Sequence, residues 1–232
     1  MQLDHIKILG FDADDTLWNN ETFFREAEVD FFQLLNEYAP RAQVEKKLFE
    51  IEMQNLEQYG YGIKSFVLSM TETALFITDQ KLPGRITHEI LEIGKAMLAK
   101  PVKLLHEVEE TLGKLTETHE LVVATKGDLL DQQRKLRKSG LAKYFHHIEI
   151  MPDKQITDYQ NMLSRLKIPA QNFFMTGNSI KSDILPVLEM GGYAMHVPYH
   201  TTWVYEDVND DIQSPNFYRG KTLADLLKII EG

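Results

Sequence analysis

The sequence predicts an α/β fold: a doubly wound parallel sheet into which one all-helical domain is inserted. Short apolar segments rich in β-branched residues recur along the chain, and amphipathic stretches of helix length separate most of them. One long segment near the N-terminus shows helical periodicity alone. The chain has 232 residues, 43% of them hydrophobic, which is enough to bury a full core and a second, smaller domain.

Five segments have the length and composition of buried strands, and helical segments lie between or after them. The strand segments are residues 6–11, 121–124, 148–150, 173–175 and 194–197. Amphipathic helices are expected over residues 104–116, 129–139, 156–166 and 184–190, with a closing helix over residues 223–230. Strands that alternate with helices in this way are expected to pair in parallel.

The inserted domain shows no strand pattern. Residues 21–100 contain four helical segments separated by Pro, Gly or polar breaks. Pro101 disfavours helical geometry at the residue before it, and the α/β pattern resumes there. We therefore expect a helical domain over residues 18–99 and a core formed by residues 1–17 and 100–232. The aromatic residues of the helical domain, such as Phe31 and Phe32, are interpreted as packing between its helices rather than as a ligand site.

Composition excludes several classes of partner. The formal net charge of -10 and the pI near 5.3 argue against nucleic acid or an anionic membrane surface, because either would repel the average surface of the protein. The sequence has no cysteine, no apolar run long enough to span a membrane and no secretion leader. We expect a soluble cytoplasmic protein.

The stretch KILGFDADDTLWNN places three carboxylates, Asp12, Asp14 and Asp15, directly after the first strand. Open α/β sheets bind ligands at this end of their strands. Clustered like charges are unfavourable unless a cation or acid–base chemistry makes use of them. A calcium loop of the EF-hand type is excluded because its sixth position requires Gly and here holds Leu17. The remaining alternative is an Asp-rich turn that caps the next helix.

Four segments decide between these alternatives. They are Asp12-x-Asp14-x-Thr16, Thr125 in VVATKGD, Lys154 in MPDKQ, and Asn178 with Asp183 in MTGNSIKSDILP. In this order, they resemble the four motifs of the haloacid dehalogenase (HAD) superfamily of phosphohydrolases and phosphotransferases. The resemblance covers essentially the whole core, and the helical insertion after the first motif matches the common position of the family's cap domain.

The resemblance implies a role for each motif residue. Asp12 would be the nucleophile that forms an aspartyl-phosphate, and Asp14 the general acid and base. Thr125, the main-chain N–H of Lys126 and the Lys154 ammonium would bind the phosphoryl group. Mg²⁺ would be held by the Asp12 carboxylate, the main-chain carbonyl of Asp14, and the loop that carries Asn178 and Asp183.

Two positions depart from the family's usual pattern. Most relatives carry Asp where this chain has Asn178, and an amide brings no negative charge, so weaker metal binding is expected. Asp183 suits either direct ligation or a bond to metal-bound water, and the sequence leaves both open. Asp15 replaces a common Gly; we expect it to contribute its main-chain N–H, with its side chain facing solvent or capping the turn.

The expected function is that of a Mg²⁺-dependent phosphohydrolase acting on a small phosphorylated metabolite, as a monomer or homodimer. A phosphomutase, a haloacid dehalogenase or a weakly active phosphometabolite-binding protein are the alternatives. Two loops have open roles. Tyr59 to Lys64 is either a substrate-specificity loop or a plain turn between helices, and Pro198 to Trp203 either borders the active site or is an ordinary polar loop.

Overall fold

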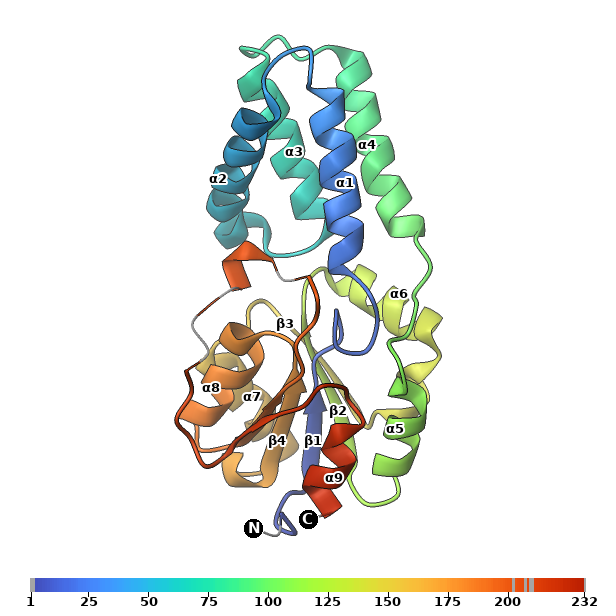
Figure 1. Ribbon diagram of the computed structural model, residues 1–232, viewed down its shortest axis with the longest axis vertical. Coiled ribbons are helices and arrows are strands. Elements are labelled where there is room, and N and C mark those ends of the chain that lie inside the picture. Colours follow the sequence, from blue (N-terminus) through green and yellow to red (C-terminus); the bar gives the residue numbers. More distant parts are fainter. Residues whose placement is uncertain (1–2, 202, 207, 209–210, 232) are drawn as a thin grey trace. The chain divides into compact units, whose positions relative to one another are not determined.

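The computed structural model describes residues 3–201, 203–206, 208 and 211–231. Its sheet has six parallel strands in the order β3-β2-β1-β4-β5-β6, and Figure 1 labels β1 to β4 of them. This confirms the predicted α/β fold class. The strands are β1 (Ile8–Phe11), β2 (Glu120–Lys126), β3 (His147–Met151), β4 (Phe173–Gly177), β5 (Tyr193–His196) and β6 (Phe217–Arg219).

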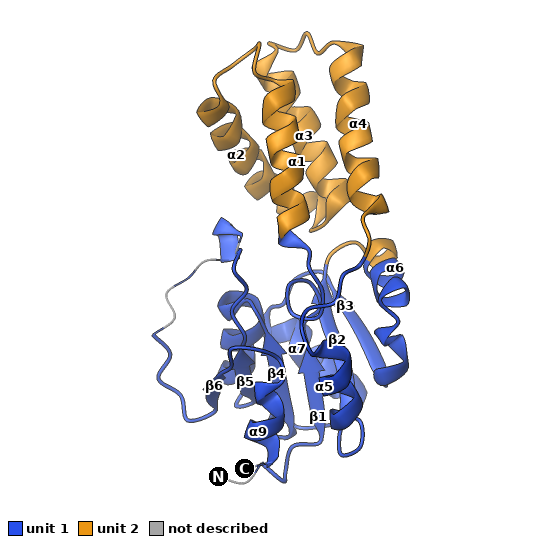
Figure 2. Cartoon of the chain, turned by 45° about the vertical axis from the view of Figure 1, so that its right-hand side comes forward, with its two compact units in different colours: residues 1–21, 102–126, 132–232 blue, residues 22–101, 127–131 orange. Residues whose placement is uncertain are grey.

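The chain divides into two compact units, shown in separate colours in Figure 2. The first comprises residues 1–21, 102–126 and 132–232 and contains the sheet. The second comprises residues 22–101 together with the short segment 127–131. That the second unit serves the first as a cap stays a prediction.

Successive residues of the strands face opposite layers of helices. In β1, Leu9 and Phe11 belong to the core beneath α5 (Val108–Leu115), α6 (Leu129–Ser139) and α9 (Asp225–Glu231). Ile8 belongs to the core beneath α7 (Ile156–Leu166) and α8 (Leu185–Glu189). Because side chains alternate along a strand, a strand covered on both faces must be apolar throughout, which is why these segments read as continuous hydrophobic runs.

The second unit is a bundle with its own core. Its helices are α1 (Glu21–Leu34), α2 (Arg41–Tyr59), α3 (Ile63–Ile77) and α4 (Gly84–Ala99). Phe31 and Phe32 are buried among apolar residues of the other helices, and Phe24 contacts Phe66 with ring centroids 5.4 Å apart. The aromatic stripe therefore packs the bundle, as its spacing predicted. None of the helices in the described residues is long and apolar enough to cross a membrane.

Two elements differ from the sequence-based expectation. Strand β6 was not predicted, because its three residues form a partly exposed sheet edge and carry no apolar run. The helix expected from residue 104 begins at Val108, after Glu107 adopts a left-handed conformation with φ 60°.

Ile180–Ile184 forms a single π-helical turn before α8, of the kind that often occurs at functional sites.

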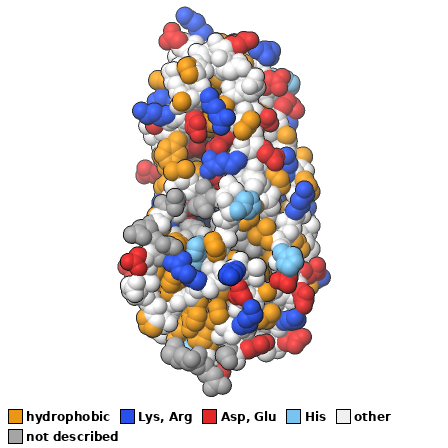
Figure 3. All heavy atoms as spheres, in the orientation of Figure 1, with side chains coloured by type: hydrophobic (Ala, Val, Ile, Leu, Met, Phe, Trp, Pro, Cys, Tyr) orange, Lys and Arg blue, Asp and Glu red, His pale blue; other side chains and the backbone are white. Residues whose placement is uncertain are grey.

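The surface carries both signs of charge. On the face shown in Figure 3, basic side chains lie interspersed with acidic ones. The net charge of -10 is therefore not gathered into one acidic patch on that face.

Candidate active site

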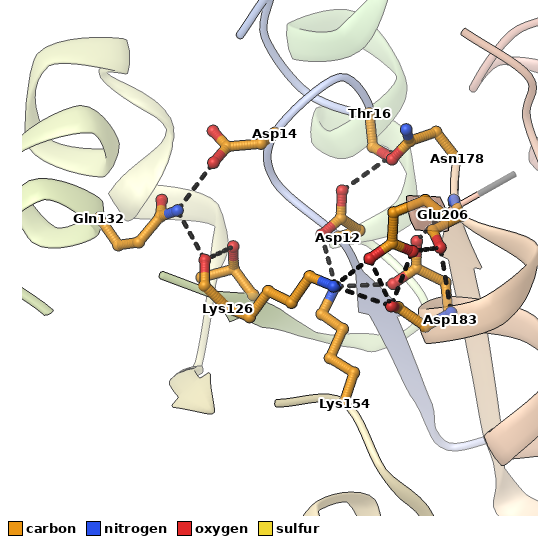
Figure 4. A network of polar contacts seen from close by, with 12 residues as sticks. Asp12, Asp14, Thr16, Lys126, Gln132, Lys154, Asn178, Asp183 and Glu206 are labelled. Carbon is orange, nitrogen blue, oxygen red and sulfur yellow. Dashed lines mark hydrogen bonds and ion pairs between the residues drawn. The ribbon is translucent and has the colours of Figure 1, made fainter. Parts of the chain in front are cut away.

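The motif residues meet at the carboxyl edge of the sheet. Asp12 directly follows β1, Lys126 ends β2, Lys154 lies in the loop after β3, and Asn178 directly follows β4 (Figure 4). Because the strands are parallel, their carboxyl ends lie along one edge, and residues far apart in the sequence become neighbours.

Lys154 joins two carboxylates at the centre of the site. Its ammonium group forms ion pairs with Oδ1 of Asp12 and, at 2.6 Å, with Oδ1 of Asp183. All three residues are buried. Burial raises the pKa of Asp12 above its ordinary value even with Lys154 beside it. Burial alone would lower the pKa of Lys154, but the two carboxylates outweigh it and raise that pKa, so the lysine stays protonated.

Asp183 also holds the loop after β4. Its Oδ2 accepts a hydrogen bond from the main-chain N–H of Ser179 at 3.0 Å, so both carboxylate oxygens are engaged by donors. A Cβ atom at Gly177 would overlap the Asp183 carboxylate, which explains why glycine occupies that position. These contacts favour a supporting role for Asp183 over direct ligation of a metal.

Asn178 contacts the opposite side of Asp12. The structure has its amide oxygen facing the first-motif loop, 3.2 Å from Oγ1 of Thr16. If the amide were turned over, its nitrogen would lie 3.2 Å from each of Oδ2 of Asp12, the main-chain oxygen of Asp14 and Oγ1 of Thr16. Thr16 has one hydroxyl proton and donates it to Oδ2 of Asp12 at 3.0 Å. With the oxygen inward, the amide faces two acceptors, Asp12 Oδ2 and the main-chain oxygen of Asp14, whereas the turned-over amide would donate to them.

The same atoms form a set suited to a hard cation. Asp12 Oδ2, the main-chain oxygen of Asp14 and the Asn178 side chain converge, and Mg²⁺ prefers oxygen ligands of these kinds. Among the described residues, no group of three or more His, Cys, Asp or Glu side chains could hold a metal, so neutral oxygens would supply much of the coordination. The residues fit Mg²⁺ with the Asn178 amide oxygen facing inward, as it lies in the structure.

The Asp14 side chain points toward α6 and away from Asp12 (Figure 4). It accepts hydrogen bonds from Nε1 of Trp18 at 2.7 Å, Nε2 of Gln132 at 2.8 Å and Nζ of Lys135 at 2.6 Å. The two aspartates of the first motif therefore have separate partners, which gives each a different electrostatic surrounding.

Asp15 is buried and caps the start of α1. It adopts a left-handed conformation with φ 64°, and its carboxylate accepts from the main-chain N–H groups of Asn20 at 2.8 Å and Glu21 at 2.9 Å. Its own N–H donates to the carbonyl of Trp18 at 2.7 Å. The side chain thus caps the turn, as one expected alternative held, while the N–H is used within the loop. Burial, and then the nearby charge of Asp14, raise the pKa of Asp15 to about 8.

A second buried network surrounds Lys126. Its ammonium group pairs with Glu206 and donates to Oγ of Ser182 at 2.9 Å, and the Glu206 carboxylate also accepts from the hydroxyls of Ser179 and Ser182. Glu206 lies on a short 3-10 helix, Val204–Glu206. Thr125 is buried beside it in the sequence of β2, with its hydroxyl 3.4 Å from the carbonyl of Lys126.

The two loops of open role contribute contacts of their own. Lys64 forms an ion pair of 2.8 Å with Asp128, which belongs to the same compact unit. The Tyr199 hydroxyl donates to Oδ1 of Asn19, and the rings of Trp203 and Tyr205 lie 5.0 Å apart. Thr202, within the second loop, lies outside the described residues.

The sequence-based reading missed the residues that support the motif side chains. Glu206 comes from a loop with no periodic pattern, so no sequence signal indicated it. Gln132 and Lys135 do carry a signal: they lie three residues apart on the helix that follows β2, so they share a face near the carboxyl edge of the sheet.

The chain is similar to known hydrolases in both sequence and fold. A family model described as haloacid dehalogenase-like hydrolase matches residues 6–191. A haloacid dehalogenase-like family hydrolase from Xanthomonas campestris shares 34% sequence identity and a TM-score of 0.87, covering 97% of this chain and 95% of its own.

Two other solved structures share the fold at lower identity. One is described as a HAD-hydrolase, YfnB from Bacillus subtilis, bound to magnesium, at 17% identity and a TM-score of 0.65, with 98% of this chain and 99% of that chain covered. The other is a 2-haloacid dehalogenase from Pseudomonas syringae pv. Tomato, at 22% identity and a TM-score of 0.64, with 97% and 98% covered. None of the curated proteins compared with this sequence matches it.

Proposed function

Because the chain belongs to the haloacid dehalogenase-like hydrolases, we propose that it is a magnesium-dependent phosphohydrolase that cleaves a small phosphomonoester through an aspartyl-phosphate on Asp12. The observation that carries the proposal is the pair of carboxylates, Asp12 and Asp14, two residues apart and held by separate sets of donors. Asp12 is suited to attack phosphorus, and Asp14 is suited to give and take protons.

In the first half-reaction, a carboxylate oxygen of Asp12 bonds to phosphorus as the bond from phosphorus to the leaving oxygen breaks. Asp14 donates a proton to that oxygen, which leaves as an alcohol. The Lys154 ammonium offsets the negative charge shared by Asp12 and the phosphoryl group, and Thr125 with the Lys126 N–H donates hydrogen bonds to phosphoryl oxygens.

In the second half-reaction, Asp14 takes a proton from water as the water oxygen bonds to phosphorus. The bond between phosphorus and the Asp12 oxygen breaks, inorganic phosphate leaves, and the Asp12 carboxylate is restored. Asp183 keeps Lys154 in place throughout, since their ion pair does not involve the reacting atoms.

Asp12, the main-chain oxygen of Asp14 and Asn178 would hold the metal. Mg²⁺, when bound, supplies positive charge that reduces the repulsion between the Asp12 carboxylate and the substrate phosphate. We further predict that the substrate is a small phosphorylated metabolite, that the protein is cytoplasmic, and that it acts as a monomer or homodimer.

A haloacid dehalogenase is the second candidate. It also uses an aspartate nucleophile, and one of the solved structures that share this fold is described as a 2-haloacid dehalogenase. However, halide is a leaving group that requires no proton, so this chemistry gives no use to Asp14 and its three donors.

The test is a substrate panel assayed with Mg²⁺ or with EDTA. Purified protein is incubated with small phosphomonoesters and with 2-haloacids, and both inorganic phosphate and halide are measured. Phosphate release that depends on Mg²⁺ supports the proposal. Halide release that is insensitive to EDTA, without phosphate release, would establish the second candidate in its place.

A further inference from the structure

Two side chains of helix α6 contact the Asp14 carboxylate, and neither belongs to the four sequence motifs. Lys135 Nζ lies 2.6 Å from Oδ1 and 2.7 Å from Oδ2 of Asp14, while Gln132 Nε2 donates to Oδ2 at 2.8 Å. Trp18 Nε1 donates to Oδ1 at 2.7 Å. Each carboxylate oxygen therefore receives two donors, and the side chain is fixed in one orientation.

The same donors connect Asp14 to other parts of the site. Lys135 also donates to Oδ1 of Asn20 at 3.1 Å, so one ammonium group bridges two points of the loop after β1. Gln132 Nε2 also donates to the main-chain carbonyl of Lys126 at 2.8 Å, which ties this loop to the end of β2. Loop, strand and helix thus share one bonded network around Asp14.

The contact between Lys135 and Asp14 is shielded from bulk water. The Lys135 side chain is 16% exposed and that of Asp14 is 22% exposed, and Gln132 is buried. An ion pair in such surroundings is screened by salt less than one at the open surface. The attraction between Lys135 and Asp14 should therefore persist at physiological salt.

We propose that Lys135, assisted by Gln132, is a positioning residue that sets the orientation of Asp14 for proton transfer. The inference rests on the proposed phosphohydrolase function. Asp14 acts twice in each turnover, first giving a proton to the leaving oxygen and then taking one from water. In each half-reaction, one hydrogen bond to the Asp14 carboxylate gives way to a contact with the reacting oxygen. Because the Lys135 ammonium is bonded to both Asp14 oxygens, it returns the carboxylate to the same orientation between the two half-reactions.

The test compares four variants on two kinds of substrate, and one of them, Lys135→Arg, keeps the positive charge. Lys135→Met keeps side-chain length and helix propensity without charge, Lys135→Gln is a second neutral variant, and Lys138→Met changes an exposed lysine of the same helix as the control. An alkyl phosphate needs a proton delivered to its leaving oxygen, whereas p-nitrophenyl phosphate does not.

We expect the neutral variants to lower kcat/KM for the alkyl phosphate about 10-fold or more and to leave kcat/KM for p-nitrophenyl phosphate within about twofold. With the aryl substrate, kcat should fall and phosphorylated protein should accumulate, because activation of water is also impaired. Lys135→Arg should recover part of the alkyl activity, and Lys138→Met should match the wild type.

Equal losses of kcat/KM on both substrates would indicate a structural role only and overturn the inference, as would no loss on either. The wild-type arm separates this result from a failure of the proposed function. If wild-type protein releases no phosphate from either ester, the function is wrong and the inference falls with it.

Discussion

Replacing Asn178 by Asp exchanges an amide that donates hydrogen bonds for a carboxylate that can only accept them. With the amide turned nitrogen-inward, that nitrogen would contact Oδ2 of Asp12, the main-chain oxygen of Asp14 and Oγ1 of Thr16. A carboxylate at this position faces two acceptors across the same gap. The variant should therefore be less stable without metal, and a cation that occupies the gap should stabilise it more than it stabilises the wild type.

The size of the effect follows from the separation of 3.2 Å between the inward-turned Asn178 nitrogen and Asp12 Oδ2. At an effective dielectric constant of about 20, two unit charges at that distance repel by about 5 kcal/mol. Lys154 and proton uptake by one carboxyl reduce this, so we expect a net loss of about 2 to 4 kcal/mol, lost hydrogen bonds included. At about 2 to 4 °C per kcal/mol, the metal-free melting temperature should fall by about 5 to 15 °C.

Thermal melts in EDTA and over a Mg²⁺ titration measure both effects. Asn161→Asp, which adds the same charge at an exposed position on α7, is the control. A tenfold tighter site adds about 1.4 kcal/mol of stabilisation at saturating metal. If Asn178→Asp melts like the wild type in EDTA and shows the same rise with Mg²⁺, then residue 178 does not ligate metal and its amide does not stabilise the loop.

Three further variants test other parts of the site. Asp12→Asn should abolish turnover without lowering the melting temperature, because it removes the nucleophile and one buried carboxylate; near-wild-type activity would contradict the assignment. Asp14→Asn should leave a phosphoryl adduct, detected by intact-mass spectrometry after reaction with an aryl phosphate; unimpaired turnover without an adduct would exclude the acid–base role. Glu206→Gln tests pH dependence: burial opposes the effect, but Lys126 lowers the pKa of Glu206 below 4.5, so its stabilising contribution is present above that value and lost as pH falls through the lowered pKa. The variant should lose less melting temperature than the wild type between about pH 6 and pH 3, and an equal loss would refute the pairing.

The sheet could be predicted from the sequence where its strands are covered on both faces. Leu9 and Ile8 face different helical layers, so their segment is apolar at every position and stands out from its surroundings. Strand β6 instead forms the edge of the sheet: Phe217 and Tyr218 are partly exposed, and Arg219 is exposed. Such a strand is defined by its pairing with β5, which only the folded chain provides.

The site could be predicted as far as its residues follow strands. Asp12, Lys126, Lys154 and Asn178 each end or follow one, so topology alone brings them to a common edge. The partners that orient these side chains could not be predicted in this way. Glu206 reaches Lys126 through a tertiary contact between segments with no shared pattern, and its role depends on the fold rather than on any local property of the chain.

The position of β1 within the sheet bears on how the protein acquires its structure. Leu9 pairs with Leu121 on one side and with Phe174 on the other, so the strand made earliest is central and has partners made much later. During synthesis it must remain unpaired while the whole helical unit emerges from the ribosome, until β2 is made, and its second partner β4 comes later still. Closure of such long chain segments precedes the contacts that reward it, so folding of the sheet should be slow compared with that of the helical bundle. The apolar segment Ile8–Phe11 then needs protection from aggregation until β2 has been made.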